Sequence, residues 1–311
     1  MASQTTTISG TRTFSWWDAH QRQLAPYVFI APFYILFLIF TVFSIAYSFW
    51  LSLFKGAGYT NIVFAGAENY LRLFSDHRFI HALINTTAFA ACSLFILTPI
   101  ALLLALALTS RLIPWSLRGF YRLSFFLPFI TSQVVISILF TLVLDHRYGL
   151  LNVLLSAIGI QGPPWLTGTD WAMRALVLIN IWMYLGFNAL YWMAGLSSIS
   201  AELYESAAID GAGPLRRFWS ITLPLLRPIT MFMVIQAVIG SYNWFATTYL
   251  LTSGGPSDAT LSLTLYLYKE AFVYSQFGYA NAIGYAMVVI VFILSLINIK
   301  LFGGFQRAAE S

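Results

Sequence analysis

The sequence predicts an all-α, polytopic membrane protein with six transmembrane helices. Of the 311 residues, 59% are hydrophobic and only 9% are charged, whereas about a quarter of the residues in soluble domains are charged. Six long stretches lack charged residues altogether. A helix needs about 20 apolar residues to cross a hydrocarbon core of about 30 Å, and each stretch satisfies this length.

A soluble helical protein does not carry six such apolar runs. Their glycines and prolines are acceptable because neighbouring helices satisfy the exposed backbone groups in a membrane. In chain order, the spans are Leu24–Phe54, Ala82–Ser110, Leu123–Leu144, Ala175–Ala201, Pro228–Ser257 and Ala271–Ile299.

The chain ends extend beyond the spans. We expect an N-terminal segment over residues 1–24, a transmembrane domain over 25–303 that includes a connector at 200–227, and a tail over 304–311. Residues 14–24 mix aromatic and charged side chains, which suits an interfacial helix, but a partly ordered tail fits equally well. No short apolar region with a small-residue cleavage site precedes the first span, so we expect no cleaved signal peptide.

Basic residues predict the orientation. With six spans, both termini lie on the same side, and that side carries ten of the 16 Lys and Arg residues while the other carries six. Because Lys and Arg are enriched in cytoplasmic loops, we expect both termini and the 200–227 connector in the cytoplasm.

The 200–227 connector contains signals for two short helices. Ser200 can cap a helix whose first turn carries Glu202, a favourable charge near a helix N-terminus. Gly211 and Gly213 permit the left-handed backbone that ends such a helix, and Pro214 is suited to open the next one. A helix, a sharp turn and a second helix on the membrane surface are expected.

This connector also resembles a known motif, the EAA loop of the membrane-spanning subunits of binding-protein-dependent ABC importers. Glu205, two small residues, Gly211 and an Ile-x-Leu-Pro ending have the offsets of that loop, and Ser206 is the one departure, since the family usually has Ala there. An ordinary surface connector is the alternative. The resemblance implies contact with an ATPase through Glu205, Ser206, Ala207, Ala208, Asp210, Gly211, Ile221, Leu223 and Pro224.

The resemblance extends over residues 25 to about 303. Over this range the chain is similar to the carbohydrate branch of these importers, in particular to the larger maltose-transporter membrane subunit. It rests on residues 25–54, 64–74, 249–256 and 265–272. It implies a type I ABC importer permease fold in the bacterial plasma (inner) membrane. It also implies a second permease subunit, two ATP-binding subunits, an extracytoplasmic sugar-binding protein and membrane lipid as partners.

The sequence lacks the residues that several other kinds of function would require. None of the three lysines (Lys55, Lys269 and Lys300) is followed by Ser or Thr, so a phosphate-binding P-loop is excluded. We expect no cofactor on this chain, with ATP and magnesium on the partner ATPase, no metal site, no enzyme activity and no nucleic-acid binding. Ion-coupled secondary transporters commonly place ionisable groups within their spans, and none falls well inside the spans here. Such a transporter, or a structural membrane subunit, remains the alternative.

Polar residues within the fourth and fifth spans are the candidates for a substrate path. A sugar offers hydroxyls and weakly apolar ring faces, so its site needs amides, hydroxyls and aromatic rings. Among the polar residues of these spans are Asn180 in the fourth span and Gln236 in the fifth. Buried Asn and Ser can instead bond neighbouring helices, and Trp can mark the membrane edge. With the resemblance to the maltose system, the expected substrate-path residues are Tyr184, Asn188, Gly240, Ser241, Asn243 and Trp244.

Overall fold

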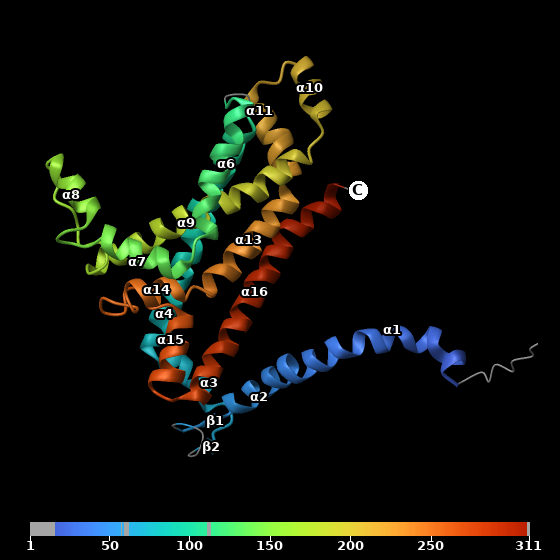
Figure 1. The fold of residues 1–311 in the computed structure, drawn as a ribbon, viewed down its shortest axis with the longest axis vertical. Coiled ribbons are helices and arrows are strands. Elements are labelled where there is room, and N and C mark those ends of the chain that lie inside the picture. Colours follow the sequence, from blue (N-terminus) through green and yellow to red (C-terminus); the bar gives the residue numbers. More distant parts are fainter. Residues whose placement is uncertain (1–15, 57, 59–61, 111–112, 310–311) are drawn as a thin grey trace, which may run out of the picture. The chain divides into compact units, whose positions relative to one another are not determined.

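The computed structural model describes residues 16–56, 58, 62–110 and 113–309, with the backbone alone for 16–23, 115 and 303–309. These residues are mainly helical, as the sequence predicts (Figure 1). The chain divides into two compact units between Leu51 and Ser52. The expected N-terminal segment is helical from Trp16 onwards, and its residues 1–15, like residues 310–311 of the tail, lie outside the described part.

From Trp16 onwards, the first unit consists of one helical rod. It comprises α1 (Trp16–Phe37), a π-helical turn (Leu38–Val42) and α2 (Phe43–Ser52), whose last residue already belongs to the second unit. The 29 residues from Leu24 to Ser52 are long and apolar enough to cross a membrane. Large apolar side chains cover this rod, and Phe29, for example, is 84% exposed. Such a surface suits a lipid or protein environment.

The second unit begins with a small hairpin. Strand β1 (Phe54–Lys55) pairs antiparallel with β2 (Val63–Phe64), in the register Phe54 opposite Phe64. Helix α3 (Glu68–Ser75) follows, and then α4 (His77–Cys92), a π-helical turn (Ser93–Leu97) and α5 (Thr98–Thr109) form one span of 33 residues. This span begins five residues before the predicted Ala82, because Asp76 caps α4 by accepting hydrogen bonds from the N–H groups of residues 78 and 79.

The third expected span is not a single helix. Helix α6 (Trp115–Ile130) and helix α7 (Gln133–Val143) meet at an angle of 95°. Pro128 lacks the N–H that would continue the hydrogen-bond ladder, and residues 131 and 132 adopt extended conformations. The expectation of one continuous helix over 123–144 is therefore wrong.

Beyond α7, short helices alternate with spans. Helix α8 (Leu150–Ala157) precedes the 29-residue span α9 (Thr169–Ser197). The connector after α9 contains four helical elements: α10 (Ala201–Ile209), α11 (Pro214–Arg217), a π-helical turn (Phe218–Thr222) and α12 (Leu223–Leu225). The fifth span is α13 (Arg227–Tyr242) followed, after a break, by α14 (Ala246–Leu251). Its helical part ends at Leu251, six residues short of the predicted Ser257.

The chain closes with α15 (Leu263–Tyr268), a π-helical turn (Lys269–Val273) and α16 (Phe277–Ala309). The sixth span starts at Phe277 instead of the predicted Ala271, because Ser275 has a φ of 56° and interrupts the helix. Five described helices are long and apolar enough to span a membrane, or six if the bent pair α6–α7 counts as one span. This agrees with the predicted six spans.

Four clusters of buried side chains lie among the described residues of the second unit, and two of them join several helices each. One joins α4, α13, α15 and α16, with Tyr266 and Tyr279 among its fully buried members. The other joins α5, α9 and α13 around Trp192 and Leu226. Helices α13 and α16 run side by side (Figure 1). One polar cavity is lined by the middle of α9 and by residues at or near the ends of α4, α7, α13 and α14.

Candidate functional site

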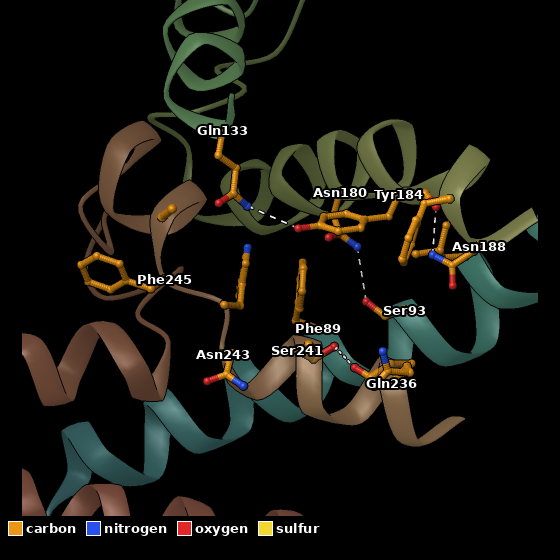
Figure 2. Close-up of a pocket in the computed structure, with 16 residues that line it drawn as sticks. Phe89, Ser93, Gln133, Asn180, Tyr184, Asn188, Gln236, Ser241, Asn243 and Phe245 are labelled. Atoms are coloured by element: carbon orange, nitrogen blue, oxygen red, sulfur yellow. Dashed lines mark hydrogen bonds between the residues drawn. The ribbon is translucent and has the colours of Figure 1, made fainter. Parts of the chain in front are cut away.

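A cavity of about 340 Å³ lies among helices of the second unit (Figure 2). The residues that line it come from α4 and the π-helical turn after it, from α7, α9 and α13, from the break before α14, and from the first residue of α14. They are Phe89, Ser93, Leu97, Gln133, Asn180, Tyr184, Phe187, Asn188, Gln236, Ala237, Gly240, Ser241, Asn243, Trp244, Phe245 and Ala246.

Helical periodicity explains two of the walls. On α9, Asn180, Tyr184 and Asn188 follow one another at intervals of four residues and share one face of the helix. On α13, Gln236 and Gly240 do the same. The stripe that α9 presents to the cavity is polar, whereas α13 presents Gln236 together with small residues.

Helix α9 can approach α6 closely because it has no side chain at Gly186. A Cβ atom placed on Gly186 would lie 2.0 Å from the carbonyl oxygen of Phe125. The backbone of α6 therefore lies directly against α9. The ring of Phe129 on α6 stacks on Phe187 with 3.9 Å between centroids. This contact fixes the part of α9 that carries Tyr184 and Asn188.

The fifth span is interrupted at the cavity, over residues 243–245. The carbonyl oxygen of Tyr242 accepts a hydrogen bond from Thr264 Oγ1 at 2.7 Å, and that of Trp244 accepts one from Ser262 Oγ at 2.7 Å. A helix end within a membrane must have its free backbone groups satisfied by protein. These two hydroxyls, at the start of α15, meet that need.

Most of the polar groups around the cavity are bonded to protein. Ser241 Oγ donates to the carbonyl of Ala237 at 2.6 Å, and Asn188 Nδ2 donates to the carbonyl of Tyr184 at 2.8 Å. Asn243 Nδ2 similarly donates to a carbonyl on the preceding turn. A longer bond of 3.5 Å joins Gln133 Nε2 to the hydroxyl of Tyr184 (Figure 2). These bonds hold the side chains in place, and their amide oxygens can accept further hydrogen bonds.

Trp244 differs from its neighbours because its ring is packed and its N–H is not bonded. Its ring stacks on Phe89, with centroids 3.6 Å apart and an angle of 6° between the planes. One face of the indole is therefore covered by protein. Within the described residues, Nε1 has no hydrogen-bond partner.

The cavity lining contains no Lys, Arg, Asp, Glu or His among the described residues. Its polar groups are amides, hydroxyls and one indole N–H, and aromatic rings make up much of the remainder. An arrangement of this kind can bind an uncharged molecule with many hydroxyl groups, and it offers no counter-ion for a charged one.

All six residues predicted for the substrate path line this one cavity. Whether they contact a substrate stays a prediction. Sequence reasoning missed Phe89, Ser93 and Gln133. A polar residue in an apolar stretch, as Gln133 is, gave a signal that could have been used, whereas nothing in the sequence marks Phe89 as a cavity residue.

The connector forms the helix, turn and helix that the sequence predicts. Ser200 Oγ accepts a hydrogen bond from the N–H of Glu202, and α10 follows. The helix ends at Gly211, whose φ is 77°, with the N–H of Gly211 bonded to the carbonyl of Ala208 and the N–H of Ala212 to that of Ala207. This pair of bonds is the Schellman arrangement. Gly213 has a φ of −68°, so the expectation of a left-handed conformation there is wrong.

The predicted coupling residues fall into two groups. Those on α10 and its turn are largely exposed, while those that follow α11 are partly buried. The hydroxyl of Tyr204 joins the two parts through a hydrogen bond of 2.9 Å to Thr222 Oγ1. The apolar side chains of Ile209 and Leu215 flank the turn and are strongly exposed. A contact with an ATPase stays a prediction.

A separate group of ionisable side chains surrounds the start of α4. Asp76 Oδ2 accepts hydrogen bonds of 2.5 Å from the hydroxyls of Tyr266 and Tyr279. Burial raises the pKa of Asp76, but these bonds and two backbone N–H groups outweigh it and hold the pKa below its ordinary value. Burial raises the pKa of Glu270. The guanidinium of Arg72 lies 3.9 Å from the Glu270 carboxylate and acts in the opposite direction, lowering this pKa.

Comparison with known proteins gives concordant results. Residues 97–307 match the family described as binding-protein-dependent transport system inner membrane component. The chain is 34% identical over 301 residues to the arabinooligosaccharides transport system permease protein AraP of Bacillus subtilis (strain 168), which covers 96% of this chain and 95% of that one. It is 36% identical over 277 residues to the lactose transport system permease protein LacF of Rhizobium radiobacter, with 88% and 92% covered.

A similar fold occurs in the crystal structure of a bacterial ABC transporter involved in the import of the acidic polysaccharide alginate. The TM-score is 0.78 at 25% sequence identity, and the match covers 92% of this chain and 97% of that chain.

Proposed function

Because this chain belongs to the family of binding-protein-dependent transport system inner membrane components, we propose that it is the membrane-spanning permease subunit of an ABC importer for uncharged sugars or related polyols. The relatives named above are permeases for arabinooligosaccharides and lactose. The observation that carries the choice of substrate is the cavity, since its lining combines amides, hydroxyls and aromatic rings without a charged side chain in the described part.

The importer contains further subunits. A second permease completes the pathway, as the resemblance to the membrane-spanning subunits of binding-protein-dependent ABC importers implies. Two ATP-binding subunits hydrolyse ATP and hold its magnesium, since this sequence cannot form a phosphate-binding P-loop. An extracytoplasmic binding protein delivers the sugar, in keeping with the family description.

The orientation follows the basic residues, with both termini and the connector in the cytoplasm of a bacterial cell. The exposed α10, the turn at Gly211 and the side chains of Ile209 and Leu215 support a role in docking. We assign the contact with the ATPase to this surface. Closure of the ATPases then moves the connectors of both permeases as packed bodies, which opens the cavity alternately to the two sides of the membrane.

Reconstitution of the purified complex in vesicles tests this function. Radiolabelled lactose, maltose and arabinotriose are offered outside with the binding protein, and ATP is enclosed on the side of the ATPases. We expect uptake of at least one of these sugars, which stops when ATP is replaced by ADP or when the binding protein is omitted. Uptake driven by a sodium or proton gradient without ATP would instead identify a secondary transporter and refute the proposal.

A further inference from the structure

A separate cavity, of about 510 Å³, lies where the segment between the first two spans meets the start of the sixth. The hairpin, α3 and the start of α16 lie side by side there (Figure 1). The second span begins at His77 and the sixth at Phe277, so this cavity lies at a membrane surface. We call it the outer cavity, because the predicted orientation places residues 53–76 outside the cell. Its lining includes Lys55, Val63, Glu68, Asn69, Arg72 and Gln276.

The guanidinium of Arg72 is held in place without being hydrogen-bonded. It lies over the ring of Tyr279, 3.7 Å from the centroid, and 3.9 Å from the carboxylate of Glu270. The second distance is too long for a hydrogen bond, and within the described residues the Arg72 side chain donates none. About half of this side chain is exposed. A positioned guanidinium with free N–H donors suits a phosphate group, which accepts two of them at once.

The outer cavity also contains an ion pair that is open to a ligand. Lys55 Nζ contacts both carboxylate oxygens of Glu68 at 2.7 Å, and more than half of each side chain is exposed. Asn69 fixes α3 against the hairpin, because its Nδ2 donates to two backbone carbonyls at the entry to the hairpin, at 2.8 and 2.7 Å. The lining therefore presents two cations, Lys55 and Arg72, and one accessible carboxylate.

Exposed apolar side chains lie beside these charges. On α3, Leu71 and Phe74 are three residues apart and share one face, and they are 67% and 83% exposed. Val63 and Phe64 of β2 are also strongly exposed. Acyl chains cover such a surface when a short helix lies in the membrane interface. Charged groups next to an apolar face match the boundary between lipid headgroups and acyl chains.

We propose that the outer cavity binds a phosphatidylethanolamine molecule of the outer leaflet. The phosphate accepts hydrogen bonds from Arg72 and Lys55, the ammonium donates to Glu68, and the acyl chains lie against Leu71 and Phe74. Charges of both signs in the lining fit a zwitterionic headgroup. Phosphatidylglycerol offers no cation to Glu68, and the quaternary ammonium of phosphatidylcholine has no N–H to donate. This inference rests on the proposed function, which places the cavity on the outer side.

Native mass spectrometry of the purified complex in detergent tests the site. Phosphatidylethanolamine, phosphatidylglycerol and phosphatidylcholine are titrated separately onto the wild type and onto Lys55→Gln, Glu68→Gln and Arg72→Gln. Arg147→Gln is the matched control, because Arg147 is exposed, lies on the same predicted side and does not line the outer cavity. The variants at 55 and 68 remove only an exposed ion pair, which contributes little to stability. They therefore decide the question even if Arg72→Gln does not fold.

The wild type should bind phosphatidylethanolamine more tightly than the other two lipids. Loss of a hydrogen bond to a charged group should weaken this binding by about 10-fold in Arg72→Gln, and loss of an exposed charge by about 2- to 5-fold in Lys55→Gln. Glu68→Gln should abolish the preference over phosphatidylglycerol. Arg147→Gln should bind like the wild type.

Equal affinity of the wild type for all three lipids overturns the inference, as does wild-type lipid binding by both Lys55→Gln and Glu68→Gln. If these two variants bind lipid normally but need more binding protein to stimulate ATP hydrolysis, the outer cavity contacts that protein and not a lipid. The proposed function fails separately, in the uptake experiment with the wild-type complex, whichever lipid that complex binds.

Discussion

Gly186 sets the distance between α6 and α9, and its replacement by alanine should displace both helices. The new Cβ would lie 2.0 Å from the carbonyl oxygen of Phe125 and 2.8 Å from the backbone nitrogen of Phe126. These are backbone atoms, so no side chain can turn aside. Contacts of ordinary length require the helices to separate by about 1 Å, since non-bonded atoms pack at about 3.5 Å and part of the strain can be shared.

We expect this overpacking to cost about 1–3 kcal/mol, which corresponds to a fall in melting temperature of about 2–10 °C for a domain of this size. The separation would also disturb the stacking of Phe129 on Phe187 and move Tyr184 within the cavity wall. Uptake should therefore fall more than the loss of folded protein explains.

Gly240→Ala is the matched control, because it makes the same chemical change in another span. No atom lies within 4 Å of a Cβ at Gly240, which lines the open cavity, and alanine is about 1 kcal/mol more favourable than glycine in a helix. Thermal unfolding of the detergent-purified complexes, followed by size-exclusion chromatography, compares the two variants. Equal melting temperatures for Gly186→Ala and Gly240→Ala would refute the close approach of α6 and α9.

Three further predictions concern the connector and the ionisable cluster. Gly211→Val forces a β-branched residue to a φ of 77°, which costs about 1–3 kcal/mol. Uptake and binding-protein-stimulated ATP hydrolysis should therefore fall together in this variant. The control Gly213→Ala, at a φ of −68°, should leave both activities unchanged. The pKa of Glu270 is raised by burial, so its ionised form destabilises the fold, and thermal stability should rise as the pH falls from about 7 towards the raised pKa. Glu270→Gln should remove that rise, and a rise of unchanged size in the variant would contradict the assignment. Asp76 has a lowered pKa, so its contribution to the stability of the fold is present above the ordinary pKa of about 3.8 and is lost as the pH falls through the lowered value. Asp76→Asn should therefore lower the melting temperature at neutral pH. An unchanged melting temperature would show that the bonds of Asp76 to Tyr266 and Tyr279 do not stabilise the fold.

Signals in the sequence were sufficient to predict those structural features that depend only on residues close together in the chain. Ser200, Gly211 and Pro214 each take the role that their side chain or backbone predicts in the connector. The six substrate-path residues, predicted from polar residue types and from the resemblance to the maltose system, all line one cavity. The apolar stretches were enough to predict the class of fold.

Features that depend on distant parts of the chain could not be predicted in this way. The break after Tyr242 is stabilised by Thr264 and Ser262, about twenty residues further on, and no proline or glycine marks it at residues 243–245. Phe89 joins the cavity only because it stacks on a residue 155 positions later, Trp244. Hydropathy reports length and composition, and it cannot detect a contact between two apolar spans.

The two hydroxyls at the start of α15 have a mechanical consequence. Ser262 and Thr264 connect α15 to the backbone on either side of Asn243, and Asn85 of α4 holds the preceding loop through the carbonyls of Asp258 and Leu261. A displacement of that loop is therefore transmitted to the wall of the cavity through short hydrogen bonds. Insertion of a tag or label between α14 and α15 would act on the lining itself, although the insertion point lies outside the cavity.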